Sequence, residues 1–122
     1  MKRWGLLLAL ALAAASSAME AAAADVPELK CDIGPVARQF GETDWLVYSC
    51  EDKKSLVVVT APQNPARPFY FFYLYSSKGY ALHGEGTGDK NVTDKASDDL
   101  KALTEEQIAL LLSDTQKASI HK

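Results

Sequence analysis

The hydrophobic pattern is dominated by an uninterrupted run at positions 69–75, FYFFYLY, which holds six of the chain's eleven aromatic residues. Aromatic residues favour a pleated backbone, and about seven residues is a typical strand length, so the run predicts a strand. Alternation gives this strand two apolar faces, one with Phe69, Phe71, Tyr73 and Tyr75 and one with Tyr70, Phe72 and Leu74. We expect a central strand covered on both faces. In the alternative arrangement, the face of Tyr73 and Tyr75 is partly exposed and forms a contact surface. Aromatic side chains with one solvated polar end are enriched at interfaces.

Other apolar runs of strand length flank this segment. Residues 45–50 (WLVYSC) and 56–60 (LVVVT) are rich in β-branched and aromatic side chains, and residues 80–83 (YALH) follow a tight turn at Ser76 to Gly79. Residues 36–40 fit either a short strand or a helical turn, and we interpret them as a strand. Because the connections between these runs are short, neighbouring strands are expected to pair antiparallel.

Glycine and proline mark the interruptions. Gly34-Pro35 predicts a break in the chain, and residues 41–44 (GETD) predict a turn. Residues 61–68 contain three prolines, which lack a backbone donor and fix φ, so this segment predicts a rigid, exposed loop.

The C-terminal third has helical periodicity. Thr93 or Asp94 is expected to cap a helix over residues 95–102, and Thr104 with Gln107 matches a capping box for a second helix from Glu105 to about residue 117. An apolar stripe joins the two helices, made of Leu100, Leu103, Ile108, Leu111, Leu112 and Thr115. Residues 119–122 are expected to fray. The predicted fold is α+β: a four- to five-stranded antiparallel meander sheet with a C-terminal helical pair packed on one face.

The N-terminus has the layout of a secretory signal peptide. Lys2 and Arg3 precede an apolar run at residues 4–15, and small residues end at Ala24, which is the preferred cleavage position over Ala18. The predicted organisation is a signal peptide at 1–24 and one small α+β domain at 25–122, secreted or periplasmic. The apolar run is shorter than the ~20 residues of a membrane span, so no stable membrane insertion is expected after cleavage.

The two cysteines, Cys31 and Cys50, predict one disulfide, because an oxidising compartment permits it and their spacing does not fit a redox motif. The bond would staple the base of the hairpin formed by residues 36–50.

Charge and motifs exclude several classes of function. Without Lys2, Arg3 and Glu20, the 13 basic and 16 acidic side chains become 11 and 15, a net charge of −4 that argues against nucleic acid as a partner. The glycines at Gly84, Gly86 and Gly88 fit neither a P-loop nor a dinucleotide fingerprint, so we interpret them as a strand end and a mobile loop.

No catalytic set, metal site or cofactor motif is evident in the sequence. His83 with Glu85 and Asp89 is a weak metal-site candidate, since zinc sites usually have more His or Cys ligands. Asn91 begins a glycosylation sequon, which matters only in a eukaryotic source.

The sequence therefore predicts an exported, non-catalytic binding module that contacts a protein or an envelope component, as a secreted-enzyme inhibitor does. The predicted partner surface includes Arg67, Tyr73 and Tyr75. The alternative is a small enzyme or ligand carrier with a site around His83 and the loop from Gly84 to Gly88.

Overall fold

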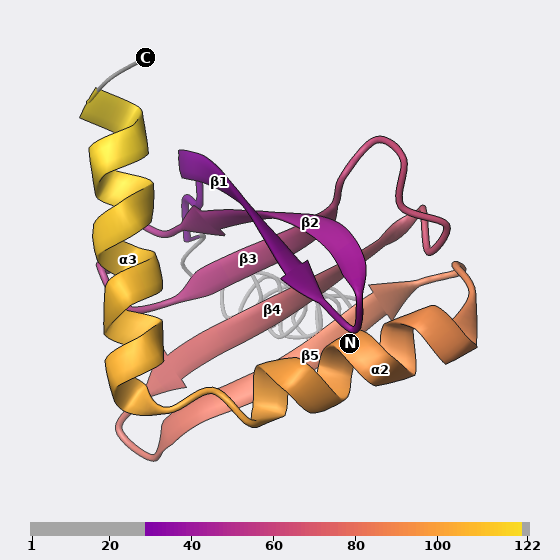
Figure 1. Cartoon of the computed structure of the whole chain (residues 1–122). Helices are drawn as coiled ribbons and strands as arrows, with labels where there is room; N and C mark the ends of the chain where they lie inside the picture. The colour runs from indigo at the N-terminus through magenta and orange to yellow at the C-terminus, as the bar shows by residue number, and fades with distance from the viewer. Residues whose placement is uncertain (1–28, 121–122) are drawn as a thin grey trace, which may run out of the picture.

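The computed structural model describes residues 29–120 (Figure 1). The predicted signal peptide with both cleavage positions lies outside the described residues, as do residues 121 and 122. The described strands and helices are β1 (Ile33–Phe40), β2 (Thr43–Ser49), β3 (Leu56–Thr60), β4 (Phe69–Ser76), β5 (Gly79–Gly86), α2 (Lys90–Lys101) and α3 (Glu105–Ile120).

The five strands form one antiparallel sheet in the order β1-β2-β3-β4-β5, so each strand pairs with its neighbours in sequence. The predicted α+β fold with a meander sheet and a C-terminal helical pair is confirmed. The aromatic run is β4, which pairs with β3 on one side and with β5 on the other. The middle position of the sheet belongs to β3.

The β1–β2 hairpin turns through only two residues, Gly41 and Glu42, and both have positive φ (60° and 64°). Such a turn matches the right-handed twist of the strands that it joins. Thr43 and Asp44, predicted as turn, therefore belong to β2. The predicted break at Gly34-Pro35 is also wrong, because β1 runs through these residues with an irregular register between Ile33 and Val36. An edge strand tolerates proline at such a bulge.

The hydrophobic core lies between one face of the sheet and the two helices. Trp45, at its centre, is fully buried and its indole Nε1 donates to the carbonyl of Phe40 at 3.0 Å. The strands contribute Phe40, Trp45, Val47, Leu56, Val58, Phe71 and Tyr73, and the helices contribute Ala96, Leu100, Ile108 and Leu111. The predicted apolar stripe of the helices thus packs on the sheet, with Leu103 and Leu112 partly buried at its margin.

Both helices are longer than predicted. The first, α2, begins at Lys90 because Asp89 is its N-cap and accepts from the backbone N–H of Asn91 at 2.9 Å; neither Thr93 nor Asp94 caps it. The capping box of α3 is confirmed, with Thr104 and Gln107 bonded reciprocally at 2.8 and 3.1 Å. This helix continues to Ile120, and Ser119 accepts from the N–H of Gly34 at 2.7 Å, so fraying from residue 119 is wrong.

The glycine-rich segment is packed backbone rather than a mobile loop. Gly84 and Gly86 belong to β5, where Gly84 lies across from Phe71 and a Cβ on Gly84 would meet the ring of Phe69 at 3.0 Å. A Cβ on Gly88 would lie 1.5 Å from the carbonyl oxygen of Ala66. The alternate glycines are therefore required by the close approach of residues 84–88 to residues 66–71.

The predicted disulfide is confirmed: the sulfur atoms of Cys31 and Cys50 lie 2.03 Å apart. Ile33 pairs with Ser49 directly beside this bond, so the bond closes the open end of the β1–β2 hairpin. Within residues 29–120, no helix combines the length and the apolar character needed to cross a membrane.

Candidate functional site

The sheet face opposite the helices is largely apolar, and we call it the outer face. The strand register aligns its side chains in rows across the sheet. One row is Leu46, Val59, Tyr70 and Glu85, the next is Tyr48, Val57, Phe72 and His83, and the third is Leu74 with Ala81. The outer face is therefore aliphatic and aromatic across β2, β3 and β4 and becomes polar at the β5 edge.

Nothing in residues 29–120 covers the outer face, since α2 and α3 both pack on the opposite side of the sheet (Figure 1). Its larger side chains shield one another: the rings of Tyr70 and Phe72 meet edge to face with centroids 5.8 Å apart. Leu74, at the end of β4, remains 39% exposed. Contiguous apolar surface on a small domain typically marks a contact site.

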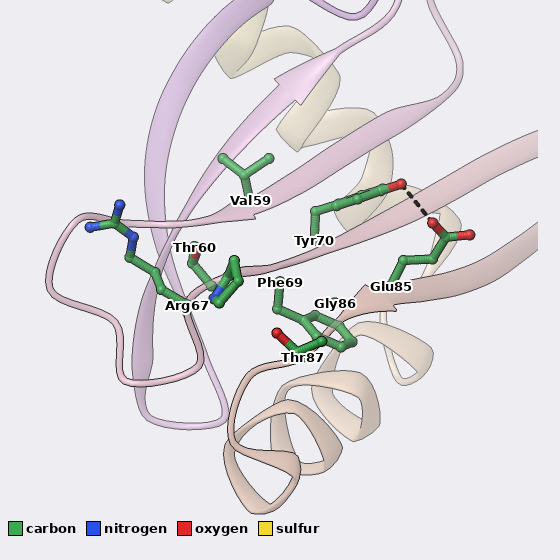
Figure 2. Close-up of a pocket in the computed structure, with 9 residues that line it drawn as sticks. Val59, Thr60, Arg67, Phe69, Tyr70, Glu85, Gly86 and Thr87 are labelled. Carbon is green, nitrogen blue, oxygen red and sulfur yellow. Dashed lines mark hydrogen bonds between the residues drawn. The ribbon is translucent and has the colours of Figure 1, made fainter.

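A shallow hollow of about 570 Å³ adjoins this face where the ends of β3, β4 and β5 meet the loop of residues 61–68. Its lining residues are Val59, Thr60, Arg67, Pro68, Phe69, Tyr70, Glu85, Gly86 and Thr87. Figure 2 shows Arg67 at one side of the hollow and the Tyr70–Glu85 pair at the other, with Phe69 between them. The hollow thus has an apolar centre with opposite charges at its two sides.

Both charged groups have defined contacts. Arg67 Nη1 donates to the carbonyl of Pro62 at 3.0 Å. The hydroxyl of Tyr70 donates to Glu85 Oε2 at 2.9 Å, and this hydrogen bond, together with partial desolvation and the carboxylate charge, raises the pKa of Tyr70. The hydrogen bond holds the Glu85 carboxylate beside the Tyr70 hydroxyl.

The predicted surface residues Arg67, Tyr73 and Tyr75 do not lie on one surface. Tyr73 is only 7% exposed and packs edge to face on Tyr80 under the helices, where burial raises the pKa of its hydroxyl. Tyr75, on the same strand face, is 42% exposed beside the start of α3, with Lys54 Nζ 5.0 Å from its ring centroid. The face of Tyr73 is thus the covered one, and the uncovered face is that of Tyr70, Phe72 and Leu74.

The sequence alone does not single out the outer-face residues of β2 and β3, among them Tyr48, Val57 and Val59. Their signal was the apolar character of alternate positions on both faces of these strands, which the sequence alone could not assign to one side. Arg67, predicted as part of the partner surface, lies at the edge of this face rather than beside Tyr73.

The alternative site residues have separate surroundings. His83 is exposed on the outer face across from Phe72, Glu85 accepts the Tyr70 hydroxyl, and Asp89 caps α2. Across the described part of the chain, no three His, Cys, Asp or Glu side chains gather as a metal ion would require. Comparison with family models, with curated proteins and with solved structures finds no match for this chain.

Proposed function

We propose that the protein is an exported, non-catalytic binding module that contacts another protein or an envelope component through the outer face. The observation that carries this proposal is the row of aliphatic and aromatic side chains on a sheet face that no described element covers. An inhibitor of a secreted enzyme is one member of this class.

Leaving this apolar face in water costs free energy. Burying a large apolar side chain contributes about 1.5–3 kcal/mol, so a partner that covers Phe72, Leu74 and their neighbours gains substantial free energy even after the cost of association. The face is broad and lies on a sheet, which suits the surface of a macromolecule better than a small substrate, since small-molecule sites are concave.

Export is supported by two independent features. The leader at residues 1–24 has the layout of a signal peptide, and the bond between Cys31 and Cys50 is of a kind that persists in oxidising compartments.

The alternative function, a small enzyme or ligand carrier, requires a concave site that includes His83. The hollow beside the outer face is lined by Glu85 and Gly86 but not by His83. This arrangement favours a binding contact over catalysis.

The test compares two exposed leucines on opposite sides of the molecule. Leu74 on the outer face is 39% exposed, and Leu110 on α3 is 64% exposed. We expect Leu74→Lys in the tagged, exported protein to reduce capture of the partner from envelope extracts by about tenfold or more, because a charge would have to be buried at the contact. Leu110→Lys is the matched control and is expected to capture as the wild type does.

Circular dichroism and urea unfolding establish that both variants remain folded. Equal loss of capture in the two variants, or full capture by Leu74→Lys, would contradict a contact through the outer face.

A further inference from the structure

The hollow beside the outer face adds a cationic side chain, Arg67, to the apolar side chains of that face. It is continuous with the outer face, because Val59 and Tyr70 belong to both. Arg67 is exposed, and of its guanidinium nitrogens only Nη1 has a hydrogen-bond partner within residues 29–120, where no carboxylate pairs with the side chain. Among the described residues, its other guanidinium donors are therefore unpaired at the margin of an apolar surface.

We infer that Arg67 and this hollow bind a carboxylate side chain that lies next to an apolar residue in an extended segment of the partner protein. This inference rests on the proposed function, since it specifies part of the partner that the outer face contacts. A guanidinium presents a planar pair of donors that matches the two oxygens of a carboxylate. The apolar neighbour of that carboxylate would lie on Phe69 and Pro68 at the centre of the hollow.

The opposite side of the hollow limits the class of ligand. Glu85 uses Oε2 to accept from Tyr70, and its other oxygen is available to accept a backbone or side-chain donor of the bound segment. With one arginine at one side of the hollow and the carboxylate of Glu85 at the other, a phosphate dianion or a polyanion is disfavoured, because its second negative charge has no cationic partner in the lining. A single carboxylate within a peptide, with N–H donors beside it, fits both charges.

The backbone that carries Arg67 is fixed before any partner arrives. Asn64 is buried, and its side chain donates to the carbonyl of Asp44 at 2.7 Å and accepts from the N–H of Ala66 at 2.8 Å. Ala66 is itself fully buried beneath Gly88. A preorganised loop loses little entropy on binding, so the contact of Arg67 is specific rather than adaptable.

The experiment uses a phage-displayed library of random linear peptides, selected in parallel on four immobilised forms of the exported protein. These are the wild type, Arg67→Ala, Leu74→Lys and Arg38→Ala; Arg38 pairs with Asp114 on the helix side and controls for the loss of any arginine. We expect the wild type and Arg38→Ala to enrich peptides in which Asp or Glu adjoins an apolar residue. For one such peptide, we expect Arg67→Ala to weaken binding about tenfold or more and Arg67→Lys to restore it in part.

The outcomes distinguish the role of Arg67 from the role of the outer face. Enriched peptides without an acidic residue, or acidic peptides that bind Arg67→Ala as well as the wild type, would overturn the role of Arg67. If such peptides still fail to bind Leu74→Lys, the outer face remains the contact surface. No enrichment on the wild type above the bare support would count against both.

Discussion

At the scale of single residues, the connection between β2 and β3 depends on one carboxylate. Asp52 accepts from the backbone N–H groups of Lys54 and Ser55 at 3.0 and 2.8 Å, and from the Ser55 hydroxyl at 2.7 Å. The Ser55 oxygen in turn accepts from the N–H of Tyr75 at 3.0 Å. Burial alone would raise the pKa of Asp52, but the hydrogen bonds from Ser55 and Lys54 outweigh it and lower the pKa below 3.8.

We expect Asp52→Ala to reduce the free energy of unfolding by about 1–2 kcal/mol at pH 7, because Ser55 is fully buried and loses its partner. A lowered folded-state pKa stabilises the fold fully above the unfolded value of 3.8, and that contribution is lost as the pH falls through the lower folded value. Urea unfolding from pH 7 to pH 2 should therefore show a difference between variant and wild type that shrinks only below about pH 4. Asp94→Ala, on the exposed side of α2, is the control; a difference that grows toward acid would contradict this account.

At the scale of elements, α3 is joined to the sheet by a buried pair of hydroxyls as well as by apolar contacts. The Oγ atoms of Thr115 and Ser49 lie 2.7 Å apart and both residues are fully buried. Thr115→Val keeps the shape of the side chain and removes the hydroxyl, which leaves Ser49 without this partner. We expect a loss of about 1–3 kcal/mol in the free energy of unfolding.

The double variant Ser49→Ala/Thr115→Val tests whether this loss comes from the unpaired hydroxyl. Replacing both partners removes the unsatisfied group, so the double variant should be less destabilised than the sum of the two single changes. Additive losses in urea unfolding would mean that the pair is not coupled.

The strands and the start of α3 could be predicted because their signals are local. The aromatic run of β4 and the capping box at Thr104 and Gln107 each depend on residues adjacent in sequence. The predictions were wrong where contacts between segments distant in sequence determine the local structure. The sequence predicts a mobile loop at Gly88, whereas Ala66 leaves no room there for a side chain. It predicts fraying at Ser119, whereas the Ser119 hydroxyl accepts from the N–H of Gly34.

For the same reason, the two faces of β4 could be predicted from the sequence, but which of them the helices cover could not. Alternation correctly divided β4 into two faces, but both faces are aromatic, so the helices could have covered either one. The choice depends on the whole sheet: Trp45, Val47 and Val58 share the face of Phe71 and Tyr73, and together they fill the space under α2 and α3. Arg67 could be identified because it stands in a proline-rich loop, but its position beside the outer face needed the register of β3 and β4.

At the scale of the whole molecule, the described part of the chain is a sheet with helices on only one side, so the core forms on one sheet face and no described helix covers the other. A domain of this size buries a smaller share of its surface than a large one, so a covalent constraint adds usefully to its stability. The bond between Cys31 and Cys50 supplies one, because it ties the segment before β1 to the end of β2. It does so without covering the outer face.

We expect Cys31→Ala/Cys50→Ala to lower the free energy of unfolding by about 3 kcal/mol, the chain-entropy contribution of a loop of this length. The two residues are separated by 19 positions, and neither belongs to the apolar cluster between sheet and helices, so the variant should keep the native circular dichroism. Wild type reduced with dithiothreitol should unfold at the same urea concentration as the double variant, because both proteins lack the disulfide. Dithiothreitol should leave the unfolding of the double variant unchanged. If the double variant is as stable as the oxidised wild type, the packing of the helices on one face of the sheet is sufficient to hold this fold, and the chain-entropy account of the disulfide is wrong.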